Sequence, residues 1–238
     1  MATSPFKALL VGNVMPEKCY EEILVNFHWH VQCVMYVLTK AAGLWIMLDT
    51  LLAQLPQLLR VLWKGSAEGL SLTSALLQLY ALSCPVIYAK ANNFPFFAWA
   101  DRLLTVAQAA AIVFLILHYR GETLKGLLLL PGCGGVMLLL ASRAAAKVVT
   151  LIQASSSVAA IASKAVQTFT NYSHGHTGQL SGLSVALTGV GSLGVVVVSL
   201  QEAGGSLATL LDTLSAGLSL LLLAQVLCYS SSAKKKRD

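Results

Sequence analysis

Apolar residues dominate seven stretches of the chain, and each is long enough to cross a bilayer as a helix, which takes about 20 residues. Short polar connections separate the stretches, so neighbouring helices are expected to run antiparallel. The pattern predicts an all-α membrane protein with seven transmembrane helices. The predicted spans are Ala41–Leu62, Leu70–Ala89, Trp99–Tyr119, Leu124–Ser142, Val148–Gln167, Leu180–Leu200 and Ser206–Tyr229.

The fifth stretch is the most polar of the seven, because it contains Gln153, three consecutive serines and Lys164. Its small residues suit a helix that packs inside a bundle. If this segment does not cross the bilayer, the number of spans falls to six.

The composition agrees with a lipid environment. Charged residues make up 11% of the chain, hydrophobic residues 56%, and the mean hydropathy is +0.72, whereas soluble domains carry about 25% charged residues. The net charge is +6, but four of the sixteen Lys and Arg residues lie in the tail Lys234–Arg237. The others lie near the ends of apolar runs without a basic, aromatic-rich stripe, so a nucleic acid partner is not expected.

The distribution of basic residues predicts the orientation. The side that holds the first, third and fifth connections and the tail carries nine Lys and Arg residues, and the opposite side carries five. The tail supplies this whole margin. Since basic residues favour the cytoplasmic side, we expect a cytosolic C-terminus and a lumenal N-terminus.

An internal repeat appears when the sequence is shifted by 110 residues. Gln57 then aligns with Gln167, Gly65 with Gly175, and Leu70-Ser71 with Leu180-Ser181. Each match lies where a helix end is followed by a short polar loop and the next helix start. The two copies are separated by an even number of crossings, so the sequence predicts a parallel repeat of the kind found in some transporters. We therefore expect Gln57 and Gln167 to face each other and to line one cavity open to the cytoplasm.

A Leu55-Pro56-Gln57 segment lies near the end of the first predicted helix. A proline there removes a backbone donor and frees a carbonyl, and a glutamine can form hydrogen bonds across the bundle. The segment is a hinge beside a central cavity or an ordinary proline kink. Asp49 lies about two turns earlier, and an ionisable group at that depth indicates a functional site or a carboxyl hydrogen-bonded inside the bundle.

Other reactive side chains give weaker signals. Among the five cysteines, Cys19 and Cys33 can pair if the N-terminus is lumenal, and the sequence does not decide this. His174 and His176 lack a third ligand nearby, so solvated loop histidines are favoured over a metal site. None of the hydrolase, metalloprotease or nucleotide-binding motifs is present, so we expect no enzymatic activity, cofactor or metal.

Several segments together resemble the PQ-loop family of seven-helix membrane proteins, and in particular one branch of that family. The resemblance covers nearly the whole chain. It is carried by Leu55-Pro56-Gln57, Lys64–Leu72 (KGSAEGLSL), Asn92–Phe96 (NNFPF), His118–Gly121 (HYRG), Asn171–Ser181, Pro16–Tyr20 and Val148–Ser155.

The resemblance implies two parallel three-helix bundles joined by a linking helix. The segments implied are a lumenal segment (1–40), a first bundle with the Pro-Gln loop (41–119), a linking helix (120–147), a second bundle with a degenerate loop (148–229) and a cytosolic basic tail (230–238). It departs from the family at Val166-Gln167, where the second proline is missing, at Asp49, and over Ala141–Lys147.

The resemblance also implies a function. Members of this branch are needed in the endoplasmic reticulum membrane for the use of dolichol-phosphate mannose and dolichol-phosphate glucose in N-glycan precursor and GPI-anchor synthesis. They move or present the lipid, or support the lumenal glycosyltransferases that use it. Other family members transport small solutes such as sugars or amino acids, which is the alternative. The candidate ligand-binding residues are Asp49, Pro56, Gln57, Lys64, Lys164 and Gln167.

The tail offers an additional hint about location. Lys235 and Lys236 lie fourth and third from the last residue, which resembles a cytosolic dilysine retrieval signal. A simple topology anchor is the alternative. Both interpretations put the tail in the cytoplasm.

Overall fold

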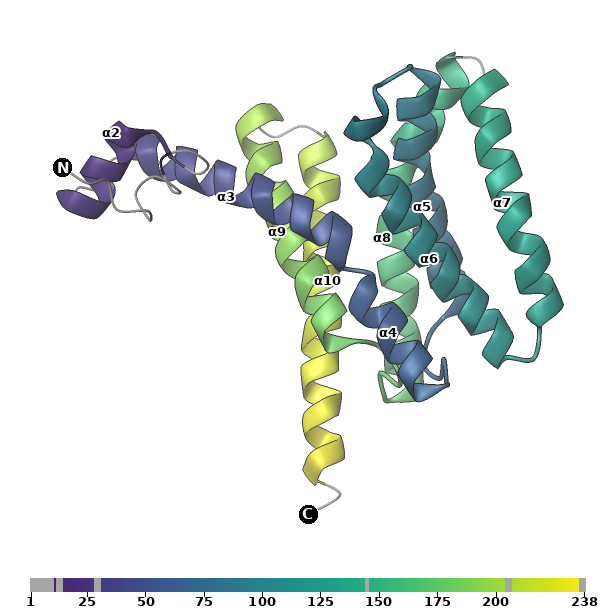
Figure 1. The fold of residues 1–238 in the computed structure, drawn as a ribbon. Coiled ribbons are helices and arrows are strands. Elements are labelled where there is room, and N and C mark those ends of the chain that lie inside the picture. The colour runs from purple at the N-terminus through teal and green to yellow at the C-terminus, as the bar shows by residue number, and fades with distance from the viewer. Residues whose placement is uncertain (1–10, 12–14, 28–30, 144–145, 204–206, 236–238) are drawn as a thin grey trace.

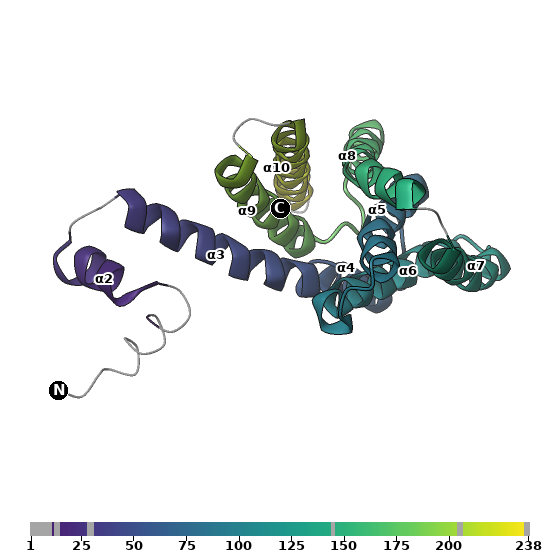
Figure 2. The same ribbon diagram turned by 90° about the horizontal axis from the view of Figure 1, so that it is seen from above.

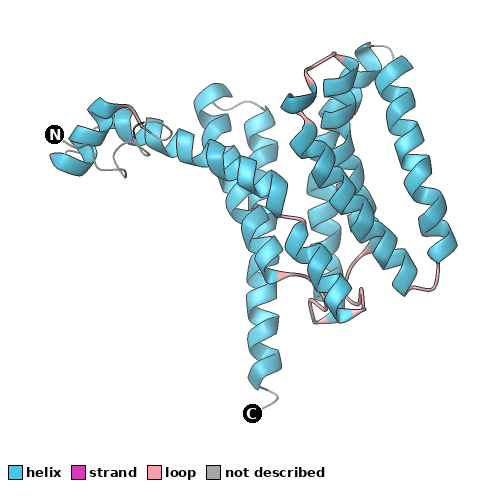
Figure 3. Ribbon diagram, in the orientation of Figure 1, coloured by secondary structure: helices cyan, strands magenta, loops and turns pink. Residues whose placement is uncertain are grey.

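A computed structural model describes residues 11, 15–27, 31–143, 146–203 and 207–235. Within these residues every regular element is a helix, and the predicted all-α fold is confirmed (Figure 3). Three short elements, α2 (Glu17–Tyr20), η1 (Glu21–Val25) and η2 (Phe96–Ala98), accompany the main helices. The main helices are α3 (Val31–Leu52), α4 (Leu55–Lys64), α5 (Leu72–Ala91), α6 (Ala100–Tyr119), α7 (Thr123–Arg143), α8 (Ala146–His174), α9 (Gly182–Ala203) and α10 (Leu207–Lys235).

Six helices of the described chain, α5 to α10, are long and apolar enough to cross a membrane. They correspond to the second to seventh predicted spans. The segment predicted as the fifth span lies in α8, which reaches further than expected, to His174. The chain is therefore a multi-pass membrane protein.

The first span differs from the prediction, which placed one helix over Ala41–Leu62. The chain instead forms α3, bends at Ala53 and Gln54, and continues as α4. Pro56 causes the interruption, because it has no N–H for the carbonyl of Leu52 and its ring collides with that carbonyl. As a result, α3 runs obliquely across the other helices, while α4 lies against the bundle (Figures 1 and 2).

The second half lacks this proline, and its first helix is not interrupted. Val166 stands at the position that aligns with Pro56, and α8 continues through it without a break. The structure thus explains the departure from the repeat as the difference between a broken helix and a continuous one.

The connections α4–α5, α6–α7 and α8–α9 lie at the same end of the bundle as the C-terminal end of α10 (Figure 1). We call this end the loop face. Two of these connections, residues 65–71 and 175–181, are the polar loops of the repeat. Their shared position confirms that the two copies run parallel.

The two halves exchange their first helices. α3 and α4 pack against α9 and α6, and α8 packs against α5 and α10. The first helix of each half therefore contacts the second helix of the other half. α7 packs on the outside of α5 and α6 (Figure 2), which agrees with a linking role.

At the N-terminus, a disulfide joins Cys19 of α2 to Cys33 in the first turn of α3, with a Cα–Cα distance of 5.3 Å. Met15 and both cysteines are buried together against Ile23 and Val37. The bond answers a question that the sequence left open.

Candidate functional site

The candidate site forms where the two repeat loops meet at the loop face. The backbone N–H of Gln179 donates to the carbonyl of Glu68 at 2.8 Å. A Cβ atom added at Gly178 would lie 2.2 Å from the same carbonyl oxygen and 2.8 Å from the Cα of Gly69. No side chain fits at this contact, so glycine is required for the loops to touch.

Gln57 of α4 holds the loop of the second half. Its Nε2 donates to the carbonyl of Gln179 at 3.2 Å, and its Oε1 accepts from the N–H of Ser181 at 2.6 Å. The side chain is buried. One amide therefore pairs a donor and an acceptor of the backbone just before α9 begins.

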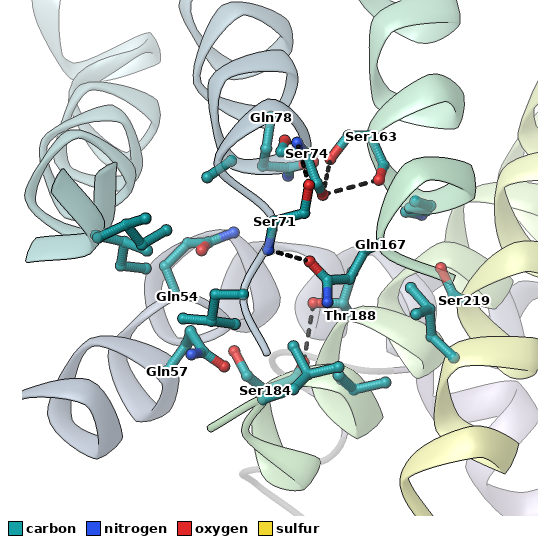
Figure 4. Close-up of a pocket in the computed structure, with 18 residues that line it drawn as sticks. Gln54, Gln57, Ser71, Ser74, Gln78, Ser163, Gln167, Ser184, Thr188 and Ser219 are labelled. Carbon is teal, nitrogen blue, oxygen red and sulfur yellow. Dashed lines mark hydrogen bonds between the residues drawn. The ribbon is translucent and has the colours of Figure 1, made fainter. Parts of the chain in front are cut away.

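Gln167 of α8 holds the loop of the first half in the same way. Its Nε2 donates to the carbonyl of Gly69 at 3.0 Å, and its Oε1 accepts from the N–H of Ser71, also at 3.0 Å (Figure 4). The shift of 110 residues converts each of these contacts into a contact of Gln57. We call this pair of interactions the reciprocal amide clamps.

A layer of serines lies directly beside the clamps. Ser74 Oγ donates to the carbonyl of Ser163 and Ser163 Oγ to the carbonyl of Ser74, both at 2.8 Å. In the other half, Ser184 Oγ donates to the carbonyl of Ala53, at the break between α3 and α4. Hydroxyls of α5 and α9 thus bind the backbone of the opposite half's first helix.

A cavity of about 140 Å³ lies among these groups. Its wall follows the repeat, because residues that line it from the first half have counterparts 110 positions later that also line it (Figure 4). Three apolar positions on α6 and α10 close one side. The paired lining residues include Gln54 with Lys164, Gln57 with Gln167, Ser74 with Ser184, Gln78 with Thr188, and Ile112 with Leu222.

Lys164 is the charged residue among the described lining residues. Its Nζ donates to Ser215 Oγ at 2.7 Å, to the carbonyl of Ser215 at 3.2 Å and to Ser192 Oγ at 3.1 Å. These contacts direct the side chain towards α9 and α10. A cation within a transmembrane segment is expensive and usually functional, and here neutral oxygens hold it at the cavity edge.

The structure brings together three of the predicted ligand-binding residues, Gln57, Gln167 and Lys164, in the wall of this cavity. Pro56 and Lys64 instead line a separate surface groove. Asp49 lies in α3, but its side chain is outside the described residues.

The other predicted polar features lie apart from the cavity. Lys235 ends α10, and Lys236 falls outside the described residues. In the described part of the chain, no group of three His, Cys, Asp or Glu residues is arranged to hold a metal. Asn171, the first residue of an Asn-Tyr-Ser glycosylation sequon, is buried and bonded to Gln167 and Gln225, so the folded protein cannot be glycosylated there.

The sequence analysis missed several cavity residues, namely Gln54, Gln78, Ser74, Ser163, Ser184 and Thr188. A usable signal existed for some of them, because the same shift of 110 residues aligns Gln54 with Lys164, Ser74 with Ser184 and Gln78 with Thr188. Paired polar positions inside two apolar runs point to a shared polar surface.

The PQ loop repeat family matches residues 38–98. The matched part runs from the middle of α3 through the broken helix, the first repeat loop, α5 and η2. The second copy of the repeat, with Val166 in place of proline, lies outside the match. No solved structure matches the chain.

We predict that Gln57→Ala and Gln167→Ala each lower the free energy of unfolding by about 1–3 kcal/mol, because each leaves buried backbone groups unpaired. The double variant should lose less than the sum, since either change loosens the same pair of loops. Chemical denaturation in detergent micelles measures both effects, with the exposed Gln32→Ala as the control. Single variants as stable as Gln32→Ala, or strict additivity, would contradict the reciprocal clamps.

Proposed function

We propose that the protein is a non-enzymatic membrane protein of the endoplasmic reticulum, required for the use of dolichol-phosphate mannose and dolichol-phosphate glucose. In this role it moves the lipid or presents it to lumenal glycosyltransferases for N-glycan precursor and GPI-anchor synthesis. The proposal draws on the resemblance of the chain to the mannose-phosphate-dolichol utilization defect 1 protein. The PQ loop match over residues 38–98 supports the broader relationship.

The observation that carries the proposal is the polar cavity at the repeat interface. Its amides and hydroxyls suit the hydroxyl groups of a sugar, and the ammonium of Lys164 suits a phosphate. A cavity of about 140 Å³ is smaller than the usual range for ligand sites of roughly 300–1,000 Å³. The proposal therefore requires the two repeat loops to separate when a headgroup enters.

A small-solute transporter is the second candidate. It is favoured by the PQ loop match and by the parallel repeat around one polar cavity, which is how several transporters form their site. The two candidates differ in whether the ligand carries a hydrocarbon chain that stays in the bilayer. Uptake of free sugars or amino acids by liposomes containing the purified protein would favour the transporter.

In cells without the protein, we expect lipid-linked oligosaccharides that lack the lumenal mannoses, while synthesis of dolichol-phosphate mannose stays normal. Wild-type protein should restore the complete oligosaccharide. Lys164→Met keeps the length of the side chain but removes its charge, so it should lower the rate of mannose addition about tenfold, equivalent to 1.4 kcal/mol.

The exposed Lys125, which pairs with Glu122 on α7, supplies the control for this experiment. Lys125→Gln should restore the oligosaccharide as well as the wild type does. Full restoration by Lys164→Met at equal protein level would refute the role of the cavity cation. Normal oligosaccharides in the deletion strain would refute the proposed function itself.

The proposed location has two supports. A Cys19–Cys33 disulfide is favoured in an oxidising compartment, which agrees with a lumenal N-terminus. The basic end of the chain, with Lys235 and Lys236, suits the cytosolic side.

Changing both Lys235 and Lys236 to serine tests the retrieval signal. If cytosolic receptors read these residues, the variant should leave the endoplasmic reticulum and gain mature glycans on an attached lumenal reporter tag. Changing Lys147 to serine, a basic residue at the other end of the bundle, serves as the control. An unchanged distribution of the double variant would leave the two lysines as topology anchors.

A further inference from the structure

A second concave feature lies on the outer surface of the protein, between α4 and α9. It has a volume of about 580 Å³ and is separate from the central cavity. Leu52, Leu55 and Leu59 form one wall, and Leu183 and Leu187 form the other. Their spacing of three and four residues places each set on one helix face. We call this feature the α4–α9 groove.

The groove is apolar along most of its length and basic at one end. Arg60, Trp63 and Lys64 line the end towards the loop face. Trp63 is 80% exposed, as expected for a tryptophan at a membrane–water interface. This places the basic end at the level of lipid headgroups and the leucines in the hydrocarbon region.

The two cations are not neutralised by the protein. Neither Arg60 nor Lys64 forms an ion pair with any residue that the structure describes. The Arg60 Nε is buried and has no hydrogen-bond partner, and its Nη2 is 3.5 Å from the carbonyl of Gly178, at the limit for a hydrogen bond. A buried donor without a partner is costly, so this guanidinium is suited to an external anion.

The groove and the central cavity share a thin wall. Pro56 lines the groove, and the next residue, Gln57, lines the cavity. Ser181 also lines the groove, and its N–H is held by Gln57 Oε1 at 2.6 Å. A lipid lying in the groove would therefore contact the helix and the loop that close the cavity.

We propose that the α4–α9 groove holds the first part of the hydrocarbon chain of an isoprenoid phosphate, with its phosphate on Arg60 and Lys64. This inference rests on the proposed function and extends it, because it assigns the lipid chain and the phosphate to residues outside the central cavity. A phosphate at the headgroup level and a chain descending past the leucines match the order of charge and apolar surface along α4. The attached sugar then lies beside the repeat loops, next to the place where they must separate.

The test measures the binding of radiolabelled dolichyl phosphate to the full-length protein in phosphatidylcholine nanodiscs. We expect Arg60→Gln to weaken binding about tenfold, as for the loss of a charge-assisted hydrogen bond. Leu183→Trp should weaken it by a similar factor, because the larger ring occupies the groove. Arg60→Lys should retain most of the affinity, since it keeps the charge.

The matched controls lie on α7, away from the groove. Lys125→Gln removes an exposed cation, and Leu128→Trp enlarges an exposed leucine. Both should bind within about twofold of the wild type, and all variants are compared at equal thermal stability. Wild-type affinity in both Arg60→Gln and Leu183→Trp would overturn the inference, and so would equal displacement of dolichyl phosphate by phosphatidic acid.

The outcomes separate this inference from the proposed function. If Lys164→Met reduces mannose addition while the groove variants bind normally, the function stands and the groove assignment fails. If the groove variants lose binding while cells that carry Lys164→Met or Arg60→Gln make normal oligosaccharides, the groove assignment stands and the function fails.

Discussion

The structure depends on how two loops satisfy their backbone groups at the end of a bundle in lipid. Unpaired N–H and C=O groups are costly where water is excluded. Gln57 and Gln167 each supply one donor and one acceptor to the loop of the other half. Because each half stabilises the loop of its counterpart, the halves cannot separate at this end without breaking both clamps. The cavity lies directly behind these contacts, so the same interaction controls its closure.

The two halves are not equivalent, and one residue accounts for the difference. Pro56 breaks the first helix into α3 and α4, whereas Val166 leaves α8 continuous. The short helix α4 therefore carries a clamp residue on its buried side and the basic end of the α4–α9 groove on its outer side. An event at the groove can reach the clamp through a single turn of helix. The continuous α8 instead holds the cavity cation, Lys164, against α9 and α10.

The hydrophobic pattern predicted six of the seven spans, and the repeat predicted that Gln57 and Gln167 would line one cavity. The first span was wrong, because the pattern of apolar residues continues through Pro56 although the backbone does not. The cavity residues Gln54 and Gln78 were missed, since a single amide in an apolar run looks the same whether it faces lipid or a cavity. Lys64 and Pro56 face the groove, and only the packing of α9 on α4 reveals this. The exchange of first helices between the halves has no signal in one sequence.

The contact between Gly69 and Gly178 gives the most direct test of loop interlock. Gly178 and Gly175 both have positive φ angles, +49° and +67°, but a Cβ at Gly175 would meet no atom within 4 Å. Alanine at either position carries a backbone penalty of about 1–2 kcal/mol, and only at position 178 does it also collide with the opposite loop. Thermal unfolding in detergent should therefore show Gly178→Ala clearly less stable than Gly175→Ala. Equal stability of the two variants would contradict the interlocked loops.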